Sequence, residues 1–84
     1  MSYIVIVPKS VQKQIDRLPK YISDKILKEI TKLEINPHPV GCKKLEGREA
    51  WRIRIGNYRV IYEINDKGKI VTLFRVRHRS NIYR

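Results

Sequence analysis

The chain has 84 residues, of which 42% are hydrophobic and 32% charged, a balance that predicts one small folded domain over residues 1–84 and excludes a disordered chain. Nineteen lysines and arginines against eight acidic residues give a net charge of +11, which favours polyanions as partners. The longest apolar run, Tyr3 to Val7, is far shorter than the ~20 residues of a membrane helix. With no secretory leader in view, we expect a cytoplasmic protein without membrane contact.

The sequence gives no sign of metal or cofactor chemistry. Cys42 is the only cysteine, and the two histidines, His38 and His78, stand apart from each other and from any cluster of carboxylates. The glycines are isolated, so none forms a phosphate-binding loop. We therefore expect no metal ion and no cofactor. Cys42 is interpreted as a partly buried small residue, and His38 as a loop residue between two prolines.

The first 36 residues predict a strand followed by two helices. Tyr3 to Val7 is β-branched and aromatic, and Pro8 closes it as a short strand. Ser10 is expected to cap a first helix and Pro19 to begin a second, which Asn36-Pro37 ends. Apolar residues recur at helical spacing in both segments: Val11, Ile15 and Leu18, then Ile22, Ile26, Ile30 and Leu33.

The rest of the chain changes to a period of two, which predicts three strands. Residues 51–55, 58–64 and 70–77 form these strands, separated by turn signals at Gly56-Asn57 and at residues 65–68. The order strand, helix, helix and three strands predicts an α+β fold. In it, an α-helical hairpin packs on one face of a small, mostly antiparallel sheet that includes the N-terminal strand.

Positive charge gathers in the second half of the chain. Residues 37–84 hold twelve basic and four acidic residues, and eight of the twelve are arginines, whose planar fork suits phosphate oxygens. A turn at Gly56-Asn57 pairs Arg54 with Arg59 and places both, with Arg52, on the face that we expect to be open. The other face, expected to meet the helices, carries Trp51, Ile53, Ile55, Tyr58, Val60 and Tyr62.

The register of the third strand depends on how the second turn pairs. If Ile64 pairs with Ile70, Arg75 falls opposite Arg59, but a slip of one residue reverses the faces. Like charges directly across a sheet are destabilising, so the arginines call for an explanation. They can splay into water or be partly neutralised by Glu49 and Glu63. We favour an anion site on the open face, in which the bound anion is a phosphate group of a nucleic acid.

The residues at the end of the chain suit cleavage of RNA without a metal. In that chemistry the 2′-OH of RNA attacks the neighbouring phosphorus, while the protein orients it, moves two protons and neutralises the phosphorane. Arginine suits the last task, and histidine is the side chain that ordinarily titrates near neutrality. His78 is therefore the candidate for proton transfer, and a surface histidine at a strand end is the plain alternative.

Two segments resemble the RelE/ParE toxin superfamily. Its central hairpin is similar to residues 51–64, WRIRIGNYRVIYEI, and its closing strand and tail are similar to residues 75–84, RVRHRSNIYR. The Leu18-Pro19 break between the helices and the end of the second helix at Asn36-Pro37 also resemble the superfamily. The resemblance therefore spans essentially the whole chain.

This resemblance implies a microbial-RNase-like fold and a toxin of a type II toxin–antitoxin system. RelE-type members are mRNA endoribonucleases that act in the ribosomal A site, beside the ribosomal RNA, and so inhibit translation. They need no metal and leave a 2′,3′-cyclic phosphate. A cognate RelB-like antitoxin neutralises them, and the pair is expected to bind operator DNA through the antitoxin. Charge complementarity with the basic chain suggests that the toxin-binding segment of the antitoxin is acidic.

The resemblance also implies roles for individual residues. Arg52 and Arg54 match two basic positions that line the active site, and Arg59 matches an arginine that stabilises the scissile phosphate. Arg79 matches another phosphate-binding arginine, and Tyr83 a tyrosine that orients the substrate or stacks on it. These five residues and His78 form the expected catalytic set. The expected RNA-binding residues around it are Lys43, Lys44, Arg48, Arg75 and Arg77.

The match departs from the family at two positions. Arg52 is a poorer base than the lysine often found there, and Glu46 stands in a loop where relatives often carry another basic residue. We therefore expect His78 to take over proton transfer. Two alternatives stay open: a ParE-like inhibitor of DNA gyrase, a type that tends to lack the full set of basic residues and tyrosine, and a non-catalytic RNA-binding module.

Overall fold

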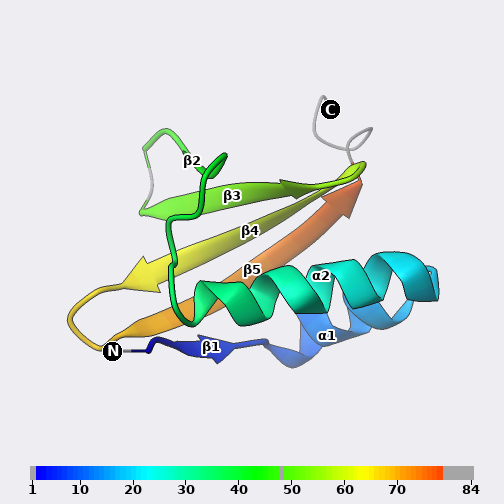
Figure 1. Ribbon diagram of the computed structural model, residues 1–84, viewed down its shortest axis with the longest axis horizontal. Helices are drawn as coiled ribbons and strands as arrows, with labels where there is room; N and C mark the ends of the chain where they lie inside the picture. The colour runs from blue at the N-terminus through cyan, green and yellow to red at the C-terminus, as the bar shows by residue number, and fades with distance from the viewer. Residues whose placement is uncertain (1, 48, 79–84) are drawn as a thin grey trace.

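The computed structural model describes residues 2–47 and 49–78, which form a five-stranded sheet covered on one face by two helices (Figure 1). The strands lie in the order β1-β5-β4-β3-β2, with β1 parallel to β5 and the other neighbours antiparallel. This confirms the expected α+β fold. The elements are β1 (Ile4–Ile6), α1 (Lys9–Asp16), α2 (Lys20–Leu33), β2 (Lys43–Lys44), β3 (Ala50–Ile55), β4 (Tyr58–Asn65) and β5 (Ile70–His78).

Both helices begin directly after a proline. The carbonyl oxygen of Pro8 accepts hydrogen bonds from Val11 and Gln12, and that of Pro19 accepts the equivalent bonds at the start of α2. The prediction of Ser10 as the N-cap is therefore wrong, because the fixed φ of Pro8 sets the cap two residues earlier. Pro19 likewise caps α2, which begins at Lys20, one residue later than expected.

The core lies between the helices and the sheet face turned toward them, as the apolar patterns predicted. Tyr62 is its largest fully buried side chain, and its hydroxyl donates to the carbonyl oxygen of Pro37 at 2.8 Å. Burial, and after it the Cys42 thiol, raises the pKa of Tyr62 above its ordinary value. Around Tyr62 the buried residues are Val11, Ile15, Ile26, Ile30, Leu33, Ile53, Ile55, Val60, Val71, Leu73 and Val76.

The register of the sheet is confirmed for one hairpin and corrected for the other. β3 and β4 pair as expected, with Arg54 opposite Arg59. Between β4 and β5 the turn is one residue shorter than predicted, so that Asn65 rather than Ile64 faces Ile70. A β-bulge at Phe74 then shifts the register between Ile61 and Tyr62 by one residue. As a result Arg75 faces Ile61 and Arg77 faces Arg59, and the expected pairing of Arg75 with Arg59 is wrong.

The short strand β2 was not predicted. Two consecutive lysines show no alternation of apolar and polar residues, so only pairing with β3 defines the strand. Lys43 faces Arg52 and Lys44 faces Trp51. Within residues 2–47 and 49–78, no helix combines the length and apolarity needed to cross a bilayer.

Candidate nucleic-acid interface

Three arginines form a row across the three central strands, close to the β3–β4 turn and on the face away from the helices. Arg54 of β3 lies opposite Arg59 of β4, and Arg59 lies opposite Arg77 of β5. Arg54 is exposed, and the other two are half-buried. The alternation of β3 and β4 turns the intervening isoleucines and valine toward the core, and this leaves the guanidinium groups on the open face.

A second basic row runs parallel to the first, two residues further along each strand. Lys43 of β2 faces Arg52 of β3, which faces Ile61 of β4, and Ile61 faces Arg75 of β5. The Arg75 guanidinium lies 5.2 Å from the centre of the Phe74 ring. The shorter turn and the bulge at Phe74 together place Arg77, rather than Arg75, opposite Arg59, and both arginines stay on the open face.

The arginines of β3 and β4 are not neutralised by the described carboxylates. No described carboxylate forms an ion pair with Arg52, Arg54 or Arg59, and the Glu49 carboxylate pairs instead with Lys44 at 3.4 Å. The reading in which Glu49 balances the arginines is therefore wrong. Repulsion between like charges, held this close by the sheet, favours binding of an anion.

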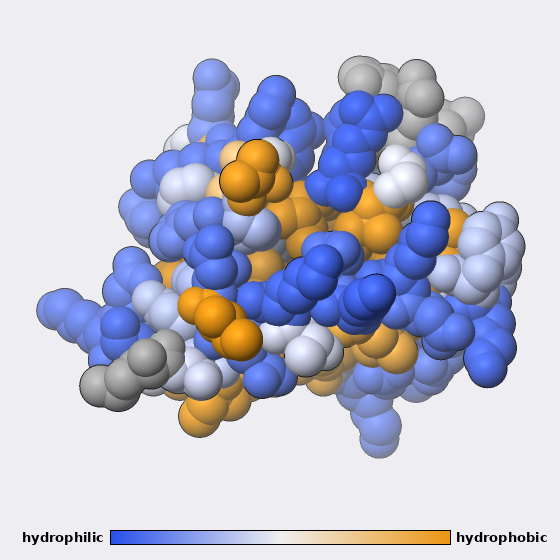
Figure 2. Space-filling model, viewed as in Figure 1, coloured by the Kyte–Doolittle hydropathy of each residue, from blue (hydrophilic) through white to orange (hydrophobic). Residues whose placement is uncertain are grey.

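A hollow of about 350 Å³ opens along β3, between α2 and the loop that enters β2. Figure 2 shows hydrophobic surface within it, between hydrophilic side chains of α2 and of the β2–β3 region. Isoleucines of β3 contribute this apolar surface, and basic side chains form the rim. The residues around it are Glu29 from α2, Pro39, Val40 and Gly41 from the loop, and Lys43, Arg52, Ile53, Arg54, Ile55 and Arg59 from the sheet.

His78 lies on the other side of the sheet from the arginine row. It ends β5 opposite Tyr58, and the two rings pack edge to face with their centres 5.0 Å apart. Tyr58 packs against the core, so the His78 ring also lies on the helix side. The structure thus separates His78 from Arg59, with which the sequence had grouped it.

The other aromatic and polar candidates take structural places. Trp51 and Tyr62 pack against or within the core, as expected. His38 is more than a loop residue, because its ring packs edge to face on that of Trp51, with the ring centres 4.5 Å apart. Cys42 is half-buried against the core, as expected. Among the described residues no group of His, Cys, Asp or Glu is arranged to hold a metal ion.

Three of the predicted site residues, Arg48, Arg79 and Tyr83, lie outside the described residues. Sequence reasoning also missed two residues that border the hollow, Glu29 and Val40. Glu29 read as part of the ordinary charged face of a helix, and Val40 as part of a loop. Glu29 and Val40 lie close to β3 because α2 and the loop after it pack against the sheet. No local sequence pattern predicts this contact.

Comparison with known proteins identifies the family. Residues 5–83 match the family described as the ParE toxin of the type II toxin–antitoxin system parDE. The chain belongs to the RelE/ParE toxin superfamily. Among curated members it is 32% identical to Toxin RelE3 of Methanocaldococcus jannaschii, over 94% of this chain and 93% of the relative. It is 30% identical to Toxin RelG of Mycobacterium tuberculosis, over 100% of this chain and 99% of the relative.

Solved structures agree with this RelE-like assignment. The toxin chain of the archaeal RelE–RelB complex from Pyrococcus horikoshii superposes with a TM-score of 0.85 at 35% identity, over 94% of this chain and 97% of that one. A free Escherichia coli RelE mutant superposes at 0.81 with 19% identity, over 99% of this chain and 90% of that one, which shows the shared fold. The protein is therefore a RelE-like toxin of a type II toxin–antitoxin system.

Proposed function

We propose that this RelE-like toxin is an endoribonuclease that cuts mRNA in the ribosomal A site and thereby inhibits translation. The observation that supports this most directly is the row of Arg54, Arg59 and Arg77, which no helix covers and whose first two members no described carboxylate neutralises. Three guanidinium groups on adjacent strands can each contact a phosphate oxygen, which suits a nucleic-acid backbone with its repeated phosphates.

The reaction needs only the RNA and the side chains. The 2′-oxygen of one nucleotide bonds to the adjacent phosphorus, the bond to the 5′-oxygen of the next nucleotide breaks, and a 2′,3′-cyclic phosphate remains. A proton leaves the 2′-OH and another reaches the 5′-oxygen. Arg59, at the centre of the row, is assigned stabilisation of the charge of the phosphorane, and Arg52 and Arg54 are assigned contacts with the flanking backbone.

The tail supplies the remaining proposed roles. Arg79 is assigned a second contact with the scissile phosphate, and Tyr83 the orientation of the substrate. His78 is assigned proton transfer, although its ring packs on Tyr58 at the helix side, so this assignment requires the substrate to approach around the end of β5. His78→Ala should then slow cleavage at least tenfold with the fold intact, and an unchanged rate would remove His78 from the mechanism.

We further propose that a RelB-like antitoxin with an acidic toxin-binding segment neutralises the protein. The net charge of +11 favours such a partner, and the similar Pyrococcus horikoshii protein is described in a complex with RelB. Covering the arginine rows would block access of RNA to them. Binding of operator DNA is assigned to the antitoxin part of the pair.

Ribosomes programmed with a defined mRNA test the proposed activity. Wild-type protein should cut within the A-site codon, and Arg59→Ala should lose nearly all cutting, while Arg17→Ala at the exposed end of α1 should keep it. An mRNA with a single 2′-deoxynucleotide on the 5′ side of the cut should resist cleavage there. Cutting at that deoxynucleotide would contradict the 2′-OH mechanism.

The description of the matching family favours a second candidate, a ParE-like inhibitor of DNA gyrase. Intact mRNA together with gyrase-dependent breaks in plasmid DNA would establish that candidate in place of the nuclease. RNA binding without either activity would indicate a non-catalytic module.

A further inference from the structure

The hollow along β3 has two chemically different parts. Its rim carries Arg52, Arg54 and Arg59, which suit phosphate, whereas its floor includes Ile53 and Ile55, which are each only 6% exposed. A nucleotide has the same two parts, a charged phosphate and a flat base of low polarity. A phosphate held on the arginine rim leaves the adjoining base beside the apolar floor of the hollow.

The loop that borders the hollow leaves an apolar side chain uncovered. Val40 is fully exposed, with Pro39 before it and Gly41 after it. Gly41 has φ +92 and open space around the position that a Cβ would take, so it adds no side chain beside Val40. An apolar side chain standing at the edge of a basic hollow suits contact with the face of a base.

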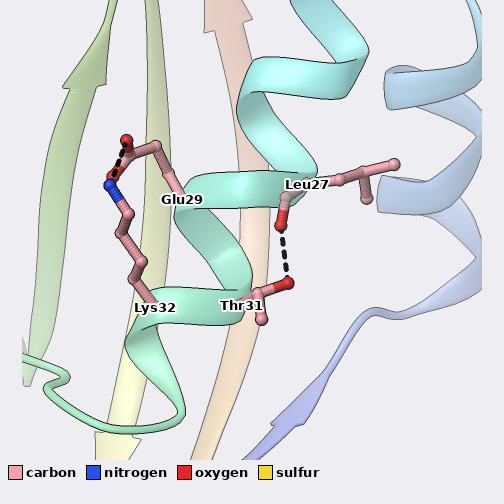
Figure 3. Close-up of polar contacts among 4 residues, drawn as sticks. All are labelled: Leu27, Glu29, Thr31 and Lys32. Atoms are coloured by element: carbon pink, nitrogen blue, oxygen red, sulfur yellow. Dashed lines mark hydrogen bonds and ion pairs between the residues drawn. The ribbon is translucent and has the colours of Figure 1, made fainter.

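One acidic side chain borders this basic hollow. Glu29 projects from α2, and its carboxylate oxygen Oε1 lies 3.3 Å from the ammonium of Lys32, one turn along the same helix (Figure 3). The Glu29 side chain is 38% exposed, so its carboxylate can still accept hydrogen bonds from a ligand. A carboxylate repels phosphate, and its presence beside three arginines therefore weakens simple attraction for a polyanion.

A carboxylate at this position can bind the ligand if it faces a base rather than a phosphate. Carboxylate oxygens accept hydrogen bonds from the N–H groups of base edges. Guanine offers two such donors side by side, N1–H and the N2 amino group, which match the two oxygens of one carboxylate. Uracil offers a single N–H flanked by carbonyl oxygens, which the carboxylate repels. Resting on the proposed function, we infer that Glu29 and Val40 form a base subsite that selects guanine next to the phosphate bound by the arginine rim.

Binding of oligonucleotides that cannot be cleaved tests this subsite apart from catalysis. Fluorescein-labelled 2′-O-methyl hexamers of uridine, with or without one central guanosine, lack the attacking 2′-OH, and fluorescence anisotropy at one fixed salt concentration reports their affinity. The guanosine hexamer should bind about fivefold more tightly or better, the lower end expected for a bidentate contact. Glu29→Gln should reduce this preference below twofold and should tighten binding of the all-uridine hexamer, because it removes a negative charge near the phosphate.

Glu34→Gln provides the matched control, because it removes the same charge from the exposed end of α2, away from the hollow. It should keep the guanosine preference. Val40→Ser should weaken both hexamers alike. A wild-type protein that binds both hexamers equally or binds neither, or a Glu29→Gln variant that keeps the preference, would overturn the subsite. A wild-type protein that prefers the guanosine hexamer but does not cut mRNA would refute the proposed nuclease activity and still support the subsite.

Discussion

The arginine row predicts that the protein gives up stability to keep its candidate site. Arg59 has a like charge directly opposite on each side, Arg54 on β3 and Arg77 on β5. Two unit charges about 8 Å apart in water repel by about 0.5 kcal/mol, within the range of ~0.2–1 kcal/mol for opposed pairs in sheets. Arg59→Gln removes both repulsions and keeps most of the aliphatic stem. The free energy of unfolding should therefore rise by about 0.5–1 kcal/mol at low salt.

Urea denaturation at pH 7 in 10 mM and 1 M sodium chloride measures this gain. Screening over about 3 Å at 1 M salt should remove most of it. Inorganic phosphate should stabilise the wild type more than Arg59→Gln, because only the wild type holds the complete row. Arg17→Gln is the control, since Arg17 caps the C-terminus of α1, where a positive charge is favourable, and its loss should slightly lower stability. An Arg59→Gln variant less stable than wild type at low salt would refute the reasoning.

Three further predictions concern the core, the sheet edge and the expected proton carrier. Tyr62→Phe leaves the Pro37 carbonyl without its donor and should lower the free energy of unfolding by about 1–2 kcal/mol at pH 7. Because the folded pKa of Tyr62 lies above its ordinary value of 10.0, this stabilisation is complete below pH 10 and is lost as pH rises further, so urea midpoints of the two proteins should converge in alkaline buffer. Gln14→Leu should cost about 1–2 kcal/mol in the same assay, since the Gln14 side-chain oxygen accepts from the Val76 N–H at 2.9 Å, beyond the end of β1. His78→Ala should lower the melting temperature by a few degrees through lost packing on Tyr58, and thermal unfolding by circular dichroism checks this independently of any cleavage assay.

Local patterns sufficed for much of the fold. The strict alternation around Gly56-Asn57 fixed the β3–β4 hairpin, including Arg54 opposite Arg59, because one slip would have turned the isoleucines to solvent. The stripe of isoleucines in α2 likewise identified the buried face of that helix. Both predictions rest on residues whose burial leaves a single arrangement.

Features that depend on contacts between distant segments could not be predicted. The shorter turn between β4 and β5 and the bulge at Phe74 together place Arg77 where Arg75 was expected, and neither has a local sequence signal. β2 exists only through its pairing with β3. Glu29 reaches the candidate site because α2 packs over the sheet, and helical periodicity alone places it only on a solvated face. The candidate site was therefore predicted on the strands and missed on the helix and the loop.

The most direct test of the central claim is the fate of mRNA in cells that express the protein. Induction in bacteria, with 5′-end mapping of a translated reporter mRNA, compares the wild type with Arg59→Ala/Arg79→Ala. We predict growth arrest with cuts confined to the translated region for the wild type, and neither arrest nor cuts for the double variant. Growth arrest with intact mRNA would contradict the account.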